Sequence, residues 1–399
     1  MSLRPFRSRR ANLAALVWLG TLGALLPGSA GACQICLPIP KRSAADRIVD
    51  AEIVVLARPD PEDPFSWKAV EVLKGENPPP IDLFVDSGMR RTFSVYTDRK
   101  MVLVHEDEGE GARWGRLEVA DELFEKVVRE IIDQSPAWAE DPRVRFDYFA
   151  RFFRHENSTL RSIAHLEVAR APYPDILSLA RRMPLEPLRE FLGDVRYVEW
   201  HALYILLLSQ SEQEEDRERI RAAVRSAEQF GLTQQLAAWA TAWIEIDEEV
   251  ALDFLGEHFL AADDSSQRQL GAVVAAMSQH GRNGHQHLRP QIVGHYRRLL
   301  EVHPDLAPDI APDLIAWQAW DLEPQIAEIL ASDQLELGLQ RVLKLREYQT
   351  LAMAAQSAKA SPKNGGDPVS GRGGQALIGI TLLGLVALAI PVGMWALRR

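Results

Sequence analysis

Cysteine and clustered positive charge are scarce in this sequence. The 399 residues contain two cysteines, Cys33 and Cys36, which excludes a small fold held together by several disulfide bonds. The formal net charge is −11, and binding to a phosphate backbone requires the clusters of lysine and arginine that an acidic chain lacks. We therefore exclude nucleic acid as a partner.

The common catalytic motifs are also missing. No segment matches a glycine-rich phosphate loop, a nucleophile elbow or the H-E-x-x-H zinc motif. A Ser/His/Asp triad remains open, because its members need not be close in sequence. No small-molecule substrate and no catalytic residue can be named, and the only cofactors that the sequence suggests are copper or zinc. We predict that the protein is not an enzyme.

Residues 1–32 are predicted to be a signal peptide. These residues contain four arginines and no acidic residue. The arginines precede an apolar segment, Leu13–Leu26, that is too short to span a bilayer. Ala30-Gly31-Ala32 supplies a small-residue cleavage site, so the mature chain would begin at Cys33. Three alternatives stay open: an uncleaved anchor, twin-arginine export and lipid attachment to Cys33.

The C-terminal end is predicted to anchor the protein in a membrane. Residues 376–397 carry no charge and are long enough for a transmembrane helix. Residues 398–399 are both arginine, which places them in the cytoplasm by the positive-inside rule. A linker rich in glycine, serine and proline, residues 356–375, precedes the span. We expect a bacterial envelope protein whose bulk is periplasmic or otherwise extracytoplasmic. The alternative is a cleaved sorting tail, which Gly373-Gly374 resembles.

Residues 33–120 are predicted to form a small β domain. Five short apolar or alternating segments are separated by glycine, proline and asparagine, as is typical of strands and turns. This spacing favours a small antiparallel barrel or sandwich. The expected strands are Ile48–Ala57, Trp67–Leu73, Ile81–Val85, Met101–His105 and Trp114–Val119.

The order of these features resembles the tissue-inhibitor-of-metalloproteinase and netrin-like barrel. An N-terminal Cys33 is followed by a strand with Asp50–Ala57 and then by Val70-Glu71-Val72-Leu73-Lys74-Gly75. The resemblance implies a closed OB-like barrel and a free Cys33 amine that chelates the zinc of a protease. The long-range disulfides of that family need cysteines that this chain lacks.

Residues 121–355 are predicted to be helical. From Asp121 the hydrophobic period changes to 3.6 and strand patterns end. Short connections with caps or breakers separate many amphipathic segments, and Ser158 or Thr159 is expected to cap one of them. The expected helices are 122–132, Val144–Phe153, Thr159–Arg170, Ile176–Met183, Leu185–Leu192, Val198–Leu208, Ile220–Phe230, Thr233–Ile246, Val250–Leu260, Ser265–Met277, Leu288–Leu300, Leu306–Trp320, Leu322–Leu330 and Leu335–Ala355.

Helices of this length joined by short turns are typical of an α-solenoid. The segment Arg161–Ala169 resembles the inner helix of a HEAT-like repeat, although the copies follow no strict period, and a compact irregular bundle is the alternative. Two tryptophan pairs, Trp239 with Trp243 and Trp317 with Trp320, each share a helix face, and we expect them to pack in the core.

Two groups of residues could carry chemistry. Cys33 and Cys36 are spaced to close a local disulfide or to bind a soft metal ion, copper(I) or zinc, and lipid attachment or a free thiol are the alternatives. Four histidines, His280, His285, His287 and His295, lie within sixteen residues. His285 and His287 flank a loop position, so His280, His285 and His287 are a second, weaker metal candidate.

The sequence best fits a membrane-anchored, extracytoplasmic scaffold that binds another protein. Its β domain would carry the two cysteines and its helical array would supply a broad surface. The whole arrangement resembles bacterial envelope proteins with an N-terminal CxxC and a HEAT-like body. The first alternative is metal or thiol-redox handling through Cys33 and Cys36, and the second is protease inhibition of the netrin-like type.

Overall fold

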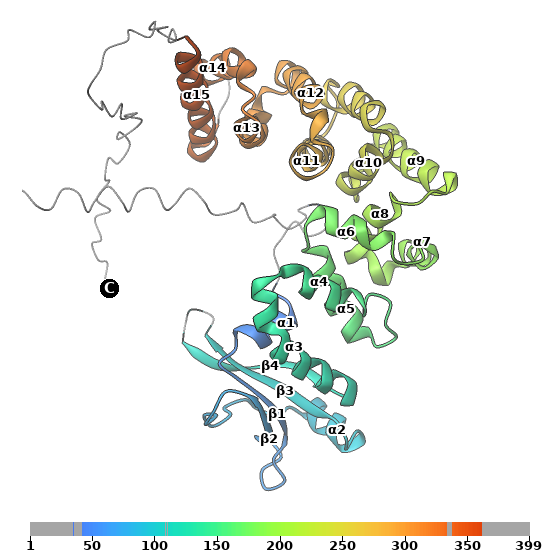
Figure 1. Ribbon diagram of the computed structural model, residues 1–399, viewed down its shortest axis with the longest axis vertical. Helices are drawn as coiled ribbons and strands as arrows, with labels where there is room; N and C mark the ends of the chain where they lie inside the picture. The colour runs from blue at the N-terminus through green and yellow to red at the C-terminus, as the bar shows by residue number, and fades with distance from the viewer. Residues whose placement is uncertain (1–34, 36–41, 108, 110, 333–336, 361–399) are drawn as a thin grey trace, which may run out of the picture. The chain divides into compact units, whose positions relative to one another are not determined.

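A computed structural model describes residues 35, 42–107, 109, 111–332 and 337–360 (Figure 1). Its N-terminal part contains one sheet of four antiparallel strands in the order β2-β1-β3-β4. The strands are β1 (Ile53–Pro59), β2 (Trp67–Lys74), β3 (Lys100–Asp107) and β4 (Ala112–Ala120). Helix α1 (Ala44–Asp50) precedes the sheet, and α2 (Ser87–Val95) connects β2 to β3.

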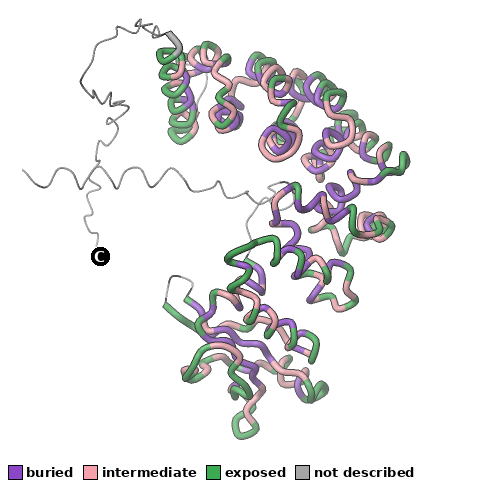
Figure 2. Tube along the Cα trace, viewed as in Figure 1, coloured by how far each residue is buried: buried purple, intermediate pink, exposed green. Residues whose placement is uncertain are grey.

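The two central strands are buried on both faces (Figure 2). Alternate side chains of a strand point to opposite faces, and in β1 and β3 both sets are apolar. One set packs with α1 and with the helices that follow the sheet, and the other packs under the segment that contains α2. The first set contains Val54, Leu56, Val102 and Val104, and the second contains Ile53, Val55, Met101 and Leu103.

The predicted antiparallel sheet is confirmed, but the predicted barrel or sandwich is wrong. Strands β2 and β4 are the two edges of an open sheet. The third expected strand, Ile81–Val85, pairs with no strand of the described sheet, although Val85 is fully buried against it. The first expected strand also began too early, because Ile48 to Asp50 belong to α1. A serine capping box at Ser43 starts that helix and commits these residues to it.

Residues 122–332 and 337–360 are helical, as the 3.6-residue period predicts. Most predicted segments coincide with an observed helix to within a few residues. Helices close in sequence pack on one another, as in stacked hairpins, whereas the HEAT-like resemblance itself stays a prediction. The helices are α3 (Glu122–Glu140), α4 (Pro142–Ala150), α5 (Ser158–Ala169), α6 (Tyr173–Ala180), α7 (Glu186–Gly193), η2 (Val195–Trp200), α8 (His201–Leu208), α9 (Glu214–Phe230), α10 (Leu236–Leu255), η3 (Gly256–Leu260), α11 (Gln267–Asn283), η4 (Gln286–Leu288), α12 (Arg289–Val302), η5 (Pro304–Leu306), α13 (Ala307–Ala316), η6 (Trp320–Leu322), α14 (Glu323–Ala331) and α15 (Leu339–Ala360).

Local signals explain several of the helix ends. Asp121 caps α3 as expected, and Gly231 ends α9 in the left-handed conformation. The cap of α5 is Asn157 and not Ser158 or Thr159. Its side-chain oxygen accepts hydrogen bonds from the backbone amides of Thr159 and Leu160, two and three residues further on. The tryptophan prediction is confirmed in part. Trp243 is fully buried and the other three tryptophans pack against the same core, but only Trp239 and Trp243 share a helix, because α13 ends at Ala316, before Trp317.

The sheet and the first helices after it share one hydrophobic core. Phe124 and Ile131 of α3, Phe149 of α4 and Leu160 of α5 pack in the cluster that contains Val54 of β1. The predicted boundary at residue 120 therefore crosses a continuous core.

No described helix is both long and apolar enough to cross a membrane. The predicted signal peptide (1–32), linker and transmembrane segment (376–397) lie outside the described residues, apart from the first positions of the linker.

A network of ion pairs ties α1 to α4 and α5. Asp46 of α1 pairs with Arg145 at 2.6 Å and with Arg170, and Arg145 also pairs with Glu167 at 2.8 Å. Burial alone would raise the pKa of Asp46. Hydrogen bonds from Arg170 and from the Ser43 amide, with the charges of both arginines, instead hold it well below its usual range. The network thus links the start of the sheet region to the helical region electrostatically.

We predict that Asp46→Asn destabilises the protein by roughly 3 kcal/mol at pH 7, because it leaves two arginines without their shared carboxylate. A carboxylate whose pKa is depressed by folding stabilises the fold above its unfolded pKa and loses that contribution as the pH falls. The difference from wild type should therefore shrink below about pH 4. Urea unfolding at pH 7 and pH 3.5 measures both effects. Asp50→Asn, on the same helix but in an exposed pair with Arg42, should cost less than about 1 kcal/mol; equal losses would contradict the prediction.

Candidate metal centre

The clearest group of chemically active side chains lies where α10 packs against α11. Five residues from these helices and from the turn η4 approach one another: Glu245, Glu248, His280, His285 and His287. They form two overlapping sets, each with ligand atoms within 4.8 Å of one another. The first set is Glu245, His280 and His285, and the second is Glu248, His285 and His287.

His280 is fully buried, and its orientation is fixed by the backbone of α10. Its Nε2 atom lies 2.9 Å from the Thr241 carbonyl oxygen. A carbonyl can only accept a hydrogen bond, so Nε2 carries the proton. Burial lowers the pKa of His280 to about 3, so the ring is neutral at pH 7 and Nδ1 presents a lone pair. That Nδ1 is buried and has no hydrogen-bond partner.

The lone pair of His280 faces a carboxylate. Glu245 Oε2 lies 4.0 Å from His280 Nδ1 and 3.4 Å from His285 Nε2. The Tyr173 hydroxyl donates to Oε2 at 2.8 Å, and the Gln210 amide donates to Oε1 at 3.1 Å. These donors hold the carboxylate in place. Two electron-rich atoms, Nδ1 and Oε2, thus face each other with no hydrogen bond between them, an arrangement that a cation would stabilise.

His285 lies between the two carboxylates. Its ring stacks on that of His280, with centroids 5.2 Å apart and an interplanar angle of 12°. Nε2 faces Glu245, is buried and makes no hydrogen bond, while Nδ1 lies 3.8 Å from Glu248 Oε1. The single histidine therefore presents one ring nitrogen to each set of ligands.

Glu248 is held in an unusual backbone conformation. Its φ of 42° and ψ of −110° interrupt α10, and a conformation of this kind in a non-glycine residue costs about 1–3 kcal/mol. The hydrophobic pattern predicts a break between two helices at this point. The kinked residue carries a carboxylate that lies 2.7 Å from His287 Nε2. Strain of this kind often marks a functional position.

The first set has the composition and approximate spacing of a transition-metal site. Imidazole and carboxylate ligands suit zinc and copper, and ligand atoms on a tetrahedral zinc ion lie roughly 3.4 Å apart. The distance from Glu245 to His285 matches this value, and that from Glu245 to His280 is slightly longer. The His280 hydrogen bond to a backbone carbonyl is the outer contact that commonly orients a metal-bound histidine.

Two glycines on α11 and its C-terminal cap make room for this arrangement. A Cβ atom on Gly284 would lie 2.6 Å from His280 Nδ1, the nitrogen that faces Glu245. A Cβ atom on Gly281 would lie 2.1 Å from the ring of Trp317, which packs against α11 beside His280. The close packing around His280 therefore depends on both positions having no side chain.

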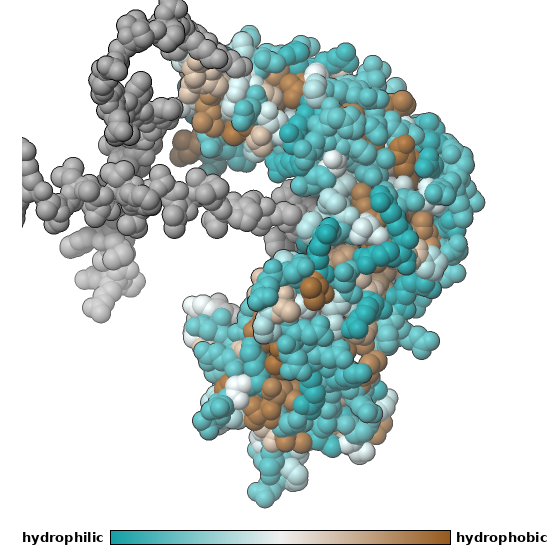
Figure 3. Space-filling model, in the orientation of Figure 1, coloured by the Kyte–Doolittle hydropathy of each residue, from teal (hydrophilic) through white to brown (hydrophobic). Residues whose placement is uncertain are grey.

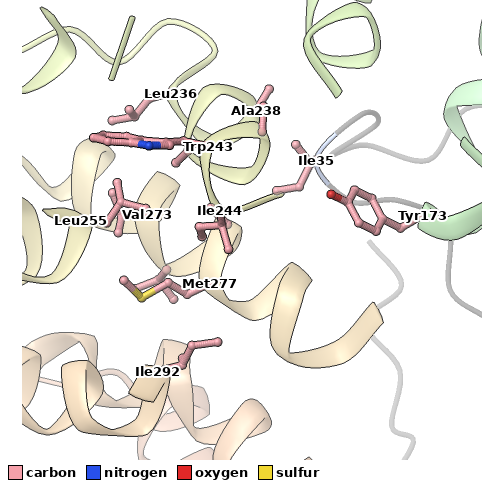
Figure 4. Packing of buried hydrophobic residues seen from close by; sticks show 14 of the residues in the cluster. Ile35, Tyr173, Leu236, Ala238, Trp243, Ile244, Leu255, Val273, Met277 and Ile292 are labelled. Atoms are coloured by element: carbon pink, nitrogen blue, oxygen red, sulfur yellow. The ribbon is translucent and has the colours of Figure 1, made fainter. Parts of the chain in front are cut away.

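The structure brings together three of the four clustered histidines. His280, His285 and His287 belong to the two sets, whereas His295 is buried on α12 and lies 3.3 Å from Asp253. Cys33 and Cys36 lie outside the described residues, so their disulfide or metal role stays a prediction. Ile35 between them is described, and it packs in the same hydrophobic cluster as Tyr173 and Ile244 (Figure 4).

The sequence analysis missed both glutamates and Tyr173. Glu245 and Glu248 are three residues apart on one helix, a spacing that places side chains on one face. That spacing is common in solvated helices, so it carries little signal alone. The two glutamates are separated from the histidines by roughly forty positions along the chain. They come close to them in space only because α10 packs on α11.

No protein-family model, curated protein or solved structure matches this chain. The netrin-like and HEAT-like resemblances therefore stay predictions.

We predict that Gly284→Ala destabilises the protein by about 1–3 kcal/mol, because the added methyl group overpacks His280. Gly271→Ala is the matched control: it lies in α11, and a Cβ there meets no atom within 4 Å. The control should be neutral or stabilising by up to about 1 kcal/mol, since alanine favours helix. Thermal unfolding of the two variants measures the difference, and an unchanged melting temperature in Gly284→Ala would show that His280 is not tightly enclosed.

Proposed function

We propose that this protein binds a divalent transition-metal ion, zinc or copper, through Glu245, His280 and His285. The observation that carries the proposal is the pair of buried nitrogens, His280 Nδ1 and His285 Nε2, that lack hydrogen-bond partners and face one carboxylate oxygen. Three protein ligands leave a fourth position for water or for a ligand from elsewhere.

This proposal builds on the histidine candidate of the sequence. The predicted role of Cys33 and Cys36 in handling copper or zinc outside the cytoplasm is a separate proposal, because thiolates also bind these ions. Ile35, which lies between the two cysteines in sequence, is buried in the cluster that contains Tyr173, and Tyr173 donates a hydrogen bond to Glu245. The cysteines and the Glu245 site should therefore be tested in one experiment.

We predict that the full chain, purified without reductant and freed of metal by a chelator, binds at least one equivalent of Zn²⁺ tightly. Glu245→Gln should weaken the tightest site at least tenfold, because loss of an outer partner alone typically costs 10- to 100-fold. The substituted amide still offers an oxygen to Tyr173, so the packing is retained. Metal analysis and competition with a chromophoric chelator measure the affinity.

Glu249→Gln is the matched control, because it makes the same charge change at an exposed position of α10 outside both sets. It should change the affinity for Zn²⁺ by no more than about twofold, which is well below the change expected when an outer partner of the site is lost. A Cys33→Ser/Cys36→Ser variant separates the two candidates. Retained binding in the cysteine variant, with loss in Glu245→Gln, supports the histidine site. Loss only in the cysteine variant would assign the ion to the thiols and refute the proposal.

A second candidate, the protein-binding scaffold, is favoured by exposed aromatic side chains beside the sheet. Phe65 and Phe84 are 45% and 58% exposed and stack with their centroids 5.6 Å apart. Phe65 lies just before β2, an edge strand on which Val70 and Val72 are also exposed. Figure 3 shows hydrophobic side chains at the surface over this part of the chain. Edge strands with exposed apolar residues are suited to pairing with an extended segment of another protein.

We predict that Phe65→Ser/Phe84→Ser abolishes cross-links between the full chain and its protein partner in intact cells, because the stacked rings supply the apolar contact. Val195→Ser is the control, since Val195 is 78% exposed but lies on η2. Cross-linked species should be identified by mass spectrometry. An identical set of species in all three proteins would rule out the aromatic pair as the contact.

A further inference from the structure

The second set of ligands shares one residue with the first. His287 Nε2 lies 2.7 Å from Glu248 Oε2, and His285 Nδ1 lies 3.8 Å from Glu248 Oε1. His285 Nε2 points instead to Glu245, at 3.4 Å. The inference drawn from this sharing rests on the proposed metal binding at Glu245, His280 and His285.

The two nitrogens of an imidazole ring point away from each other, so they cannot bind the same ion. If Nε2 binds the ion held by Glu245 and His280, Nδ1 remains directed at Glu248. Glu248 and His287 then supply two further ligands on that side of the ring. The residues around His285 therefore define two separate positions for an ion, and the ring of His285 lies between them.

The two positions differ in their exposure to water. The side chains of the first set are 0% exposed for His280, 13% for Glu245 and 24% for His285. Those of the second set are 42% exposed for Glu248 and 58% for His287. An ion at the first position would be largely surrounded by protein. One at the second position would keep several water ligands, and it would also be repelled by the first ion, so it should bind second and more weakly.

We propose that His285 bridges two transition-metal ions, an inner ion bound by Glu245 and His280 and an outer ion bound by Glu248 and His287. Each ring nitrogen of His285 donates one electron pair to one ion, so the N–H proton of the free ring is released to the solvent. His287 Nε2 donates a hydrogen bond to the Glu248 carboxylate in the metal-free protein, so it binds the outer ion only after its proton leaves that nitrogen and this hydrogen bond breaks. Copper(II) and zinc both accept such imidazole ligands. The outer ion, with three protein ligands and bound water, is the one accessible to exchangeable ligands.

The test is a titration of the metal-free full chain with Cu²⁺, followed by bound-copper analysis and electron paramagnetic resonance. The first equivalent should give the spectrum of an isolated copper(II) ion. The second should bind at least tenfold more weakly, and the integrated spin signal should fall below one spin per protein, because two copper(II) ions joined through one imidazole ring couple antiferromagnetically.

Variants of the outer position separate this inference from the proposed function. Glu248→Gln and His287→Ala should reduce the capacity to one equivalent, restore a full single-spin signal and change the first affinity by less than threefold. Glu249→Gln should behave as wild type. One equivalent in the wild-type protein, or two equivalents with a full two-spin signal, would overturn the bridge and leave the inner site standing. No binding at all in wild type would refute the proposed function itself.

Discussion

The hydrogen bond from His280 Nε2 to the Thr241 carbonyl is the contact on which the candidate centre depends. It is buried, it joins α11 to α10, and it determines which nitrogen of the ring carries the proton. Glu245 lies one helical turn after Thr241, so the group that orients the ring and the carboxylate that faces it come from the same side of α10. Tyr173 and Gln210 then hold that carboxylate from α6 and from the end of α8. Four segments of the helical region thus converge on one buried lone pair.

Part of this centre could be predicted from the sequence. His280, His285 and His287 lie within eight residues, and the loop expected around residue 286 would let them converge. Glu245 and Glu248 could not be assigned in the same way, because their proximity arises from the packing of two helices and has no local pattern. The kink at Glu248 is a related case. A break near residue 248 was visible in the hydrophobic pattern, but nothing in the sequence showed that a carboxylate would occupy it.

The helices were predicted well and the sheet less well, for physical reasons that particular residues illustrate. Caps such as Asp121 and breakers such as Gly231 act locally, so they can be recognised in a single sequence. The alternating segment Ile81–Val85 shows the opposite case. Its alternate side chains Ile81, Leu83 and Val85 pack against a face of the sheet, the first two partly buried and the third fully buried. That packing requires the same alternation as a paired strand but no ladder of hydrogen bonds. Barrel closure depends on such pairing and therefore could not be judged from periodicity.

The double burial of β1 and β3 has a consequence for how the sheet forms. When only one face of a strand is apolar, a shift by one residue exposes the wrong side chains and is rejected. In β1 both sets are apolar, so hydrophobicity alone does not distinguish the correct register from its neighbour. The short connection between β3 and β4 and the elements that cover the two faces, including Leu160 of α5, therefore help to set the register. During synthesis from the N-terminus the strands emerge before α5, so the core around β1 is complete only after about a hundred further residues have followed that strand.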